Sequence, residues 1–337
     1  MKSLSPTFCL SVTLTLLLFA CSSEEKSKKR VTASVQSAPY ELLVVANKEW
    51  LQTPAGKSLM DVVESDIEGI PQSEPCFRCT KINPASFNST FKMYGNIIFA
   101  EISSKYKTAE MRISRDLYCR PQLIIFLAAP NDKAFMELTE SRRNQILDMF
   151  NEQEFNRESR LLDKKHSGIV SQQAQKQFGV SIHAPVDIDK VKTGKDFFWA
   201  SASEQEFRMN ICIYALPLRP LTQENFIATR DSVMKINIPG GHENQWMETD
   251  SRTVTIKPKH PQQTSNPYLA MTARGLWDIR NDAMGGPFVS YVYVDEKKQC
   301  LLVTEGFVFA PKEKKRPLIR TLEAALQTLK FTKDTHY

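Results

Sequence analysis

The chain contains 337 residues, of which 42% are hydrophobic, 24% charged and 9% aromatic. This composition is that of an ordinary soluble globular protein, and it excludes both a disordered polypeptide and a multi-span membrane protein. The 12 glycines are about half of average usage, which argues against collagen-like or Gly-rich sequence. A formal net charge of +6, from 44 basic and 38 acidic residues, is too small and too evenly mixed for a nucleic-acid surface.

The first twenty residues predict an export signal. Lys2 precedes an apolar run of about 13 residues, whereas a membrane-spanning helix needs roughly 20. The run ends in leucine, phenylalanine and alanine before Cys21, and this pattern resembles a bacterial lipobox. We therefore expect residues 1–20 to be a lipoprotein signal peptide and Cys21 to carry palmitate or a similar acyl chain.

Residues 21–38 predict a disordered tether, because they are polar and have no apolar periodicity. Ser22, rather than an aspartate, follows the cysteine, and Glu24 and Glu25 come next. These residues resemble the signals that sort lipoproteins to the outer membrane and to the cell surface. The expected location is therefore the outer membrane, with a lipid anchor on the periplasmic face or at the cell surface.

Residues 39–190 predict an N-terminal α/β subdomain. Its expected buried strands are three short apolar runs, at residues 40–46, 95–102 and 122–129. A loop and a helix are expected over residues 47–63. Asp132 is the expected N-cap of a long helix, and a following helix is expected to end at Gly179 in the left-handed conformation.

Residues 191–333 predict a C-terminal α+β subdomain, joined to the first by a linker near residues 184–194. Its expected strands lie at residues 196–202, 207–216, 252–257, 268–279, 288–294 and 300–310. Thr222 is expected to cap one helix, and Pro317 to begin another with a single apolar stripe. The predicted fold class is α+β, with mixed or antiparallel sheets and helices packed on them.

Several segments resemble a known family. They lie at residues 70–77, 114–122, 195–201, 230–240 and 274–289. Together they resemble the domain of unknown function family 4837, which comprises uncharacterised lipoproteins of Gram-negative gut and oral anaerobes, over roughly residues 40–331. The resemblance implies a shared fold and an envelope location. It implies no reaction, because none is assigned to the family.

Cys76 and Cys79 form a CxxC motif within a proline-bounded segment that is expected to be extended. A redox-active pair needs its first cysteine at a helix N-terminus, and a zinc site needs a second pair. The two interpretations that remain are a disulfide and a pair of partly buried thiols. No metal or cofactor is expected.

The segment of residues 274–288 is the most suggestive candidate for contact with a ligand or partner. Trp277 ends a strand, and polar side chains then stand beside two glycines. The candidate residues are Trp277, Arg280, Asn281, Asp282, Gly285 and Gly286. Backbone N–H groups at such a bend can approach a ligand closely. In the alternative interpretation the glycines turn the chain, Asp282 caps the turn and Trp277 belongs to the core.

Two neighbouring pairs of opposite charge are further candidates. Arg115 precedes Asp116, and Arg230 precedes Asp231. Each pair is consistent with a site and also with a buried structural ion pair, which needs partners but no catalysis.

The leading functional hypothesis is a membrane-anchored envelope protein that binds another envelope protein or a glycan without turnover. The opposing hypothesis is a hydrolase or transferase that uses Arg280, Asp282 and Arg230 with a distant histidine. An open cleft that gathers these side chains would favour the enzyme, and their burial in ion pairs would favour the binding protein. A third interpretation rests on strand and helix order alone, which in the C-terminal half is similar to that of non-enzymatic accessory proteins of the photosystem oxygen-evolving complex.

Overall fold

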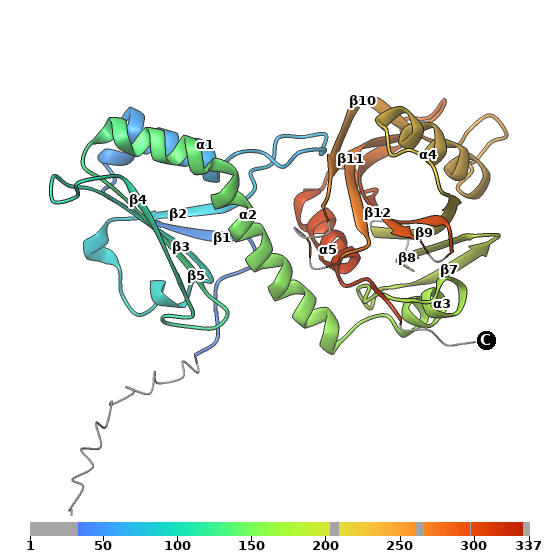
Figure 1. Ribbon diagram of the computed structural model, residues 1–337, viewed down its shortest axis with the longest axis horizontal. Coiled ribbons are helices and arrows are strands. Elements are labelled where there is room, and N and C mark those ends of the chain that lie inside the picture. The colour runs from blue at the N-terminus through green and yellow to red at the C-terminus, as the bar shows by residue number, and fades with distance from the viewer. Residues whose placement is uncertain (1–32, 203–208, 261–263, 265, 297, 333–337) are drawn as a thin grey trace, which may run out of the picture.

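The computed structural model describes residues 33–202, 209–260, 264, 266–296 and 298–332. The fold is α+β, as predicted, and two large sheets each have their own hydrophobic core (Figure 1). The predicted signal peptide, Cys21 and the tether up to residue 32 lie outside the described residues. Among the described helices, none combines the length and the apolarity needed to cross a membrane.

The first sheet has five strands. In sheet order they are β2 (Arg78–Ile82), β1 (Glu41–Val45), β3 (Asn96–Ile102), β5 (Leu123–Ala129) and β4 (Glu110–Arg115). The first four are parallel, and β4 lies antiparallel at the edge. The three strands predicted from apolar runs are the central ones, because parallel strands covered on both faces consist almost wholly of apolar residues. The edge strands β2 and β4 carry exposed charges, so no apolar run marks them.

Two helices cover one face of this sheet. They are α1 (Pro54–Val63) and α2 (Asp132–Lys164). The cap of α2 is Asn131, not Asp132 as predicted, because the Asn131 Oδ1 atom accepts a hydrogen bond from the Ala134 N–H group at 3.0 Å. Asp132 is the first helical residue, where its negative charge favours the helix N-terminus. With 33 residues, α2 is about 50 Å long and extends beyond the first sheet to the second half of the molecule.

Short elements complete the first half. They are the 3-10 helices η1 (Trp50–Gln52), η2 (Pro84–Ser86) and η3 (Phe91–Met93). Residues 34–37, which we expected in the tether, are bound to this half. The Val35 N–H group donates to the Arg120 carbonyl at 3.1 Å, and the Ser37 hydroxyl accepts from the Gly95 N–H group at 3.0 Å. The prediction of a tether up to residue 38 is therefore wrong for these residues, since local composition carries no information on such distant partners.

The second sheet has seven antiparallel strands. In sheet order they are β10 (Met247–Pro258), β11 (Leu269–Ile279), β12 (Gly285–Asp295), β13 (Cys300–Val308), β9 (Met209–Pro217), β8 (Phe197–Ala202) and β7 (Ile188–Gly194). The β7 strand occupies residues that we expected in a linker. Six of its seven residues are exposed, and an edge strand of this kind lacks the apolar alternation that marks a strand in the sequence.

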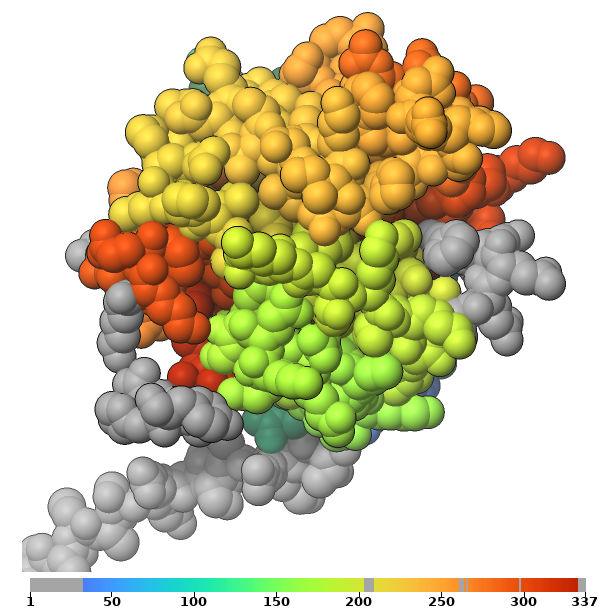
Figure 2. Space-filling view, turned by 90° about the vertical axis from the view of Figure 1, so that its right-hand side faces the viewer, coloured from blue at the N-terminus to red at the C-terminus, as the bar shows by residue number. Residues whose placement is uncertain are grey.

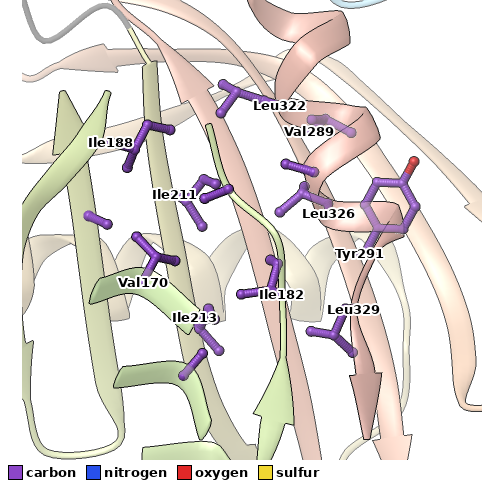
Figure 3. Close-up of a cluster of buried hydrophobic side chains, with 14 of the residues drawn as sticks. Val170, Ile182, Ile188, Ile211, Ile213, Val289, Tyr291, Leu322, Leu326 and Leu329 are labelled. Atoms are coloured by element: carbon purple, nitrogen blue, oxygen red, sulfur yellow. The ribbon is translucent and has the colours of Figure 1, made fainter. Parts of the chain in front are cut away.

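Helices lie on both faces of the second sheet. The helix α4 (Gln223–Asn237) covers one face, while α3 (Gly168–Phe178), α5 (Arg316–Gln327) and the two-stranded sheet of β6 (Val180–Ser181) and β14 (Lys330–Phe331) lie on the other. Figure 3 shows the core beneath α3 and α5. Three predicted signals are confirmed: Thr222 caps α4, Gly179 ends α3 with φ 71°, and a proline stands in the first turn of α5.

The two halves lie side by side (Figure 1). The helix α2 runs between them, and α5 lies on the side of the second half that faces the first. The loop between α1 and β2 reaches across to β10 and to the start of α5. The opposite side of the second half is rounded and is formed largely by the chain from α3 to β10 (Figure 2).

Candidate functional site

A cleft of about 680 Å³ opens between the two halves. Its walls come from α2, from the loop between α1 and β2, and from the strands β10 to β12 together with α5. Its volume lies within the range of about 300–1,000 Å³ that is typical of ligand sites. A second hollow beneath α4, of about 20 Å³, has room for about one water molecule. The cleft is therefore the candidate functional site.

Cross-strand pairing builds one side of the cleft, which we call its floor. Lys257 of β10 lies directly opposite Thr272 of β11, which in turn lies opposite Tyr291 of β12. Directly paired residues point to the same face of a sheet, and so does Arg274, two positions from Thr272. All four side chains line the cleft. The Tyr291 hydroxyl points away from the neighbouring apolar cluster (Figure 3) and accepts a hydrogen bond from the Gln327 Nε2 atom at 3.2 Å.

Helix α5 adds a polar stripe to the same floor. Arg320, Glu323 and Gln327 line the cleft and lie at positions i, i+3 and i+7, so they share one side of the helix. The apolar residues Ile319 and Leu322, which precede Arg320 and Glu323 in the sequence, pack in the core of the second half. The sequence of α5 therefore folds with one stripe in the core and another against the cleft.

Two arginines share one carboxylate at the floor of the cleft. Glu323 is fully buried and forms ion pairs with Arg274 and, at 3.1 Å, with Arg320. The Arg320 guanidinium lies over the rings of Tyr40 and Phe155, 5.3 and 5.5 Å from their centroids. Arg320 is 4% exposed, and its Nε atom has no hydrogen-bond partner in the described part of the chain. The floor therefore holds one positive charge more than negative charge.

The electrostatic consequence is visible at Arg274. Burial, together with the neighbouring positive charge of Arg320, lowers the pKa of Arg274 to about 10. A lowered pKa is expected for a buried guanidinium whose positive charge is not fully balanced by nearby negative charge. Arg274 nevertheless remains protonated at neutral pH.

The opposite wall is one face of α2. It consists of residues at helical spacing, namely Arg143, Asn144, Leu147, Asp148, Asn151, Glu152 and Phe155. The Asn151 Oδ1 atom is buried and has no hydrogen-bond partner among the described residues. Asp148 and Glu152 give this wall a negative charge that faces the positive floor. A ligand in the cleft therefore meets charges of opposite sign on its two sides.

The loop between α1 and β2 fixes the distance between the walls. The Glu74 carboxylate accepts hydrogen bonds from the N–H groups of Lys315 and Arg316, at 2.7 and 3.2 Å, and so caps α5 from the other half of the molecule. The Lys257 ammonium pairs with the Glu68 carboxylate at 2.6 Å. These contacts join the halves around the cleft and leave its interior open.

The loop that we predicted as a ligand site is a structural turn. Trp277 is 3% exposed and packs against Phe307. The Asp282 carboxylate accepts hydrogen bonds from the two following N–H groups, and Asn281 has φ 59°. Gly285 and Gly286 belong to β12 and not to the bend. Arg280 lies at the surface, over the Trp246 ring and 3.7 Å from Glu248. The cleft is lined by none of the six candidate residues.

The charged pairs behave differently from each other. Arg230 is fully buried, but its main partner is Glu305, at 2.8 Å, while Asp231 lies 3.8 Å away. Arg115 is exposed and contacts Gln153, whereas Asp116 pairs with Arg120 at 2.9 Å. The interpretation of Arg115 and Asp116 as a buried ion pair is therefore wrong, because adjacent residues of an edge strand and turn point in different directions.

The cysteines of the CxxC motif are free thiols. Cys76 is buried at the edge of the cleft, 3.9 Å from the Arg320 Nη2 atom, and Cys79 is half-buried in β2. No disulfide joins the described cysteines. Burial, with the nearby Glu64 carboxylate, raises the pKa of Cys79 to about 12, and burial likewise raises that of Cys119 to about 11.

We therefore expect Cys79 and Cys119 to alkylate slowly in the folded protein. At pH 7.5 a thiol with such a pKa is thiolate in a fraction on the order of 10⁻⁴ or less, and the thiolate is the reactive species. Iodoacetamide labelling followed by mass spectrometry measures the rate at each site, with the urea-unfolded protein as the control. Folded-state labelling as fast as in urea would contradict this expectation.

The histidines give no catalytic or metal site in the described residues. His183 contacts the Asp163 carboxylate at 2.8 Å and stacks on His166 with centroids 4.0 Å apart. No group of three or more potential metal ligands from His, Cys, Asp and Glu occurs in the described ranges. No histidine is among the described residues that line the cleft.

The sequence analysis missed the residues of the cleft. Arg274 lies in a segment that we used for the family resemblance, but it was not distinguished as a site residue. The signal for Arg320 and Glu323 is weak: they are charged residues beside the apolar stripe of α5, a position where charged residues are usually exposed. In the folded chain Phe155 of α2 and Cys76 of the loop after α1 contact Arg320. Arg274 of β11 pairs with Glu323.

Comparisons with solved structures give remote likenesses. The Ran-binding protein Mog1p of Saccharomyces cerevisiae is 9% identical, with a TM-score of 0.31 over 45% of this chain and 90% of that one. A point mutant of the protein Mog1 is 10% identical, with a TM-score of 0.32 over 47% and 92%. A protein of Bacteroides thetaiotaomicron VPI-5482 is 10% identical, with a TM-score of 0.21 over 47% of each chain. Likenesses this weak say nothing about function.

Family models match both halves of the chain, while no curated protein matches it. Residues 36–163 match the domain of unknown function DUF8532, and residues 167–328 match the domain of unknown function DUF4837. The DUF4837 match is shorter than the resemblance that we inferred from the sequence, because a separate family model covers the first sheet and α2. Over residues 167–328, the chain belongs to the DUF4837 family.

Proposed function

We propose that this protein is a lipid-anchored lipoprotein of the outer membrane, which binds a fragment of a glycan or of another envelope protein in the cleft without chemical turnover. The anchor is an acyl chain, such as palmitate, at Cys21. The lipobox-like sequence before that residue supports the anchor, and Ser22, Glu24 and Glu25 after it support the envelope location.

The observation that carries the binding function is the cleft with its unpartnered polar atoms. The Arg320 Nε donor belongs to the floor of the cleft and the Asn151 Oδ1 acceptor to the facing α2 wall. Neither atom has a hydrogen-bond partner in the described structure. Buried polar groups are almost always hydrogen-bonded, and leaving one unpaired costs about 1–3 kcal/mol. A polar ligand that bridges the two walls would satisfy both atoms.

The residues proposed for an enzyme are not gathered at this cleft. Arg230 is enclosed by Glu305 beneath α4, while Arg280 and Asp282 lie at a surface turn. A base and a nucleophile within hydrogen-bond reach are what acid–base or covalent catalysis requires. The charged groups at the floor of the cleft are already ion-paired with one another. Such an arrangement suits the recognition of a ligand better than the transfer of a proton.

The anchor has a direct test. We expect the wild-type protein to incorporate labelled palmitate and to fractionate with outer membranes, because hydrocarbon burial contributes about 0.8 kcal/mol per CH₂ group. Cys21→Ser should abolish both the label and the membrane fraction. Cys9→Ser is the matched control, since Cys9 lies within the predicted signal peptide and its loss should change neither result. An unlabelled wild type would refute the anchor.

The cleft has a separate test. Thr272→Trp places a large ring on the cleft floor, while Thr193→Trp places the same ring on the exposed edge strand β7. We expect soluble envelope fragments, such as glycan fragments and short peptides, to raise the melting temperature of the wild type and of the Thr193 variant but not that of the Thr272 variant. Equal shifts in all three proteins would contradict binding in the cleft.

A further inference from the structure

We propose that the cleft recognises an anionic group, a carboxylate or a phosphate, between Arg274 and Arg320. This inference rests on the proposed ligand-binding function and adds the chemical class of the ligand. It is based on the net charge of the cleft floor and on a hydrogen-bond donor there that has no partner among the described residues.

The first step concerns charge. Glu323 is the shared partner of both guanidinium groups, so the three side chains together carry one net positive charge. Glu323 and Arg320 are 0% and 4% exposed. A buried charge is costly unless it is paired, and Lys257, the next cation on the floor, already has Glu68 as its partner. One further anion beside the two arginines would neutralise the remaining positive charge.

The second step concerns donors. Arginine presents five N–H groups in a planar fork that matches the oxygens of a carboxylate or phosphate. In Arg320, one N–H group donates to Glu323 and another points to the Cys76 sulfur at 3.9 Å, while the Nε donor is unpartnered within the described structure. The Arg320 Nε donor therefore lacks an acceptor.

The third step concerns the remainder of the ligand. Asp148 and Glu152 lie on the α2 wall, opposite the arginines, and the unpartnered Asn151 oxygen lies between them in the sequence. These groups repel a ligand that is negative along its whole length and favour one with hydrogen-bond donors or a cation at its other end. The inferred ligand class is a small molecule with one anionic group and a neutral or cationic remainder.

Four probes separate the sources of the anion. Alanyl-alanine carries an ammonium and a carboxylate, its C-terminal amide lacks the carboxylate, N-acetyl-alanyl-alanine lacks the ammonium, and phosphoethanolamine replaces the carboxylate by a phosphate. Isothermal titration calorimetry with the full folded protein measures each affinity. We expect at least one anionic probe to bind at least tenfold more tightly than the amide. Whichever of the carboxylate and phosphate probes binds with the higher affinity identifies the preferred anion.

Two substitutions test the arginines. Arg320→Gln is expected to weaken binding of the preferred probe at least tenfold, while Arg115→Gln, an exposed residue outside the cleft, leaves it unchanged. If Arg320→Gln fails to fold, Arg320→Lys preserves a positive charge but not the planar fork, and it should weaken binding severalfold. Circular dichroism and the melting temperature verify the fold of each variant.

The outcomes distinguish this inference from the proposed function. Equal affinities for the acid and the amide, both lost in Thr272→Trp, would overturn anion recognition and leave the binding cleft intact. No binding of any probe would also overturn anion recognition, while the envelope fragments tested with the Thr272 variant decide the binding function separately. Tight anion binding that survives Arg320→Gln and Arg320→Lys would place the anion elsewhere and would equally overturn the inference.

Discussion

Replacing Arg230 by methionine should lower the free energy of unfolding by about 3–5 kcal/mol, because it leaves the Glu305 carboxylate buried without its partner. Both side chains are fully buried, and the Arg230 Nε and Nη2 atoms contact the Glu305 carboxylate at 2.8–3.2 Å. Arg230 also donates to the Thr249 hydroxyl at 2.8 Å, and its guanidinium lies 4.1 Å from the Phe288 ring centroid. Urea unfolding followed by circular dichroism measures the loss.

The Glu305 carboxylate favours the charged form of Arg230 by raising the pKa of its guanidinium. Burial alone would lower this pKa, but the facing Glu305 carboxylate outweighs that effect and raises the pKa of Arg230 above its ordinary value. A basic group with a raised pKa in the folded state contributes stability that is fully present below its unfolded pKa. The contribution of Arg230 is therefore constant at neutral pH and is lost only as the pH rises through the raised pKa.

A double-mutant cycle isolates the ion pair from the packing. Glu305→Leu alone should cost as much as Arg230→Met alone, because each leaves one buried charge. The double variant should recover much of the loss, since replacing both partners by apolar residues is often close to neutral. Additive losses, or a loss below about 1 kcal/mol for Arg230→Met, would contradict the structural role assigned to this pair.

Gly286→Ala should lower the free energy of unfolding by about 3 kcal/mol, the upper end of the usual cost of overpacking. A Cβ atom at this position would lie 1.9 Å from the Val308 carbonyl oxygen, which is a backbone atom of the neighbouring strand β13. Backbone in the interior of a sheet cannot move aside as a flexible side chain can, so the substitution overpacks the site. Thermal and urea unfolding measure the change.

Gly168→Ala is the matched control. No atom lies within 4 Å of a Cβ atom added there, and Gly168 is the first residue of α3. Alanine restricts the unfolded chain more than glycine does, so this variant should be neutral or more stable by about 0.4–1 kcal/mol. Wild-type stability of Gly286→Ala would show that the glycine is not required by packing.

The parts of the fold that could be predicted from the sequence depend on local patterns. The central strands of the first sheet, the cap at Thr222 and the apolar stripe of α5 are each specified by residues within a few positions of one another. The edge strand β7 could not be predicted in this way, because its exposed side chains follow no apolar period. The same holds for residues 34–37, whose partners lie more than fifty positions away.

The same distinction between local patterns and contacts of distant residues applies to the candidate site. A polar turn with neighbouring glycines has the same local sequence whether it binds a ligand or only reverses the chain, so residues 280–286 could not be distinguished by sequence. The hydrogen bonds of Asp282 and the contacts of Gly286 decide in favour of the turn. The cleft itself joins residues between Ser65 and Gln327, and no motif connects positions so far apart.

Local sequence patterns specify the helices and the central strands, because helix capping and apolar periodicity depend on neighbouring residues. The sequence also predicts export and acylation at Cys21, which lies outside the described residues. The burial of charges depends instead on contacts between distant segments: Arg320 and Glu323 are enclosed, while Arg115 is exposed. A buried charge requires partners, and here they come from β11 and α5, which are distant in the sequence and meet only in the folded chain.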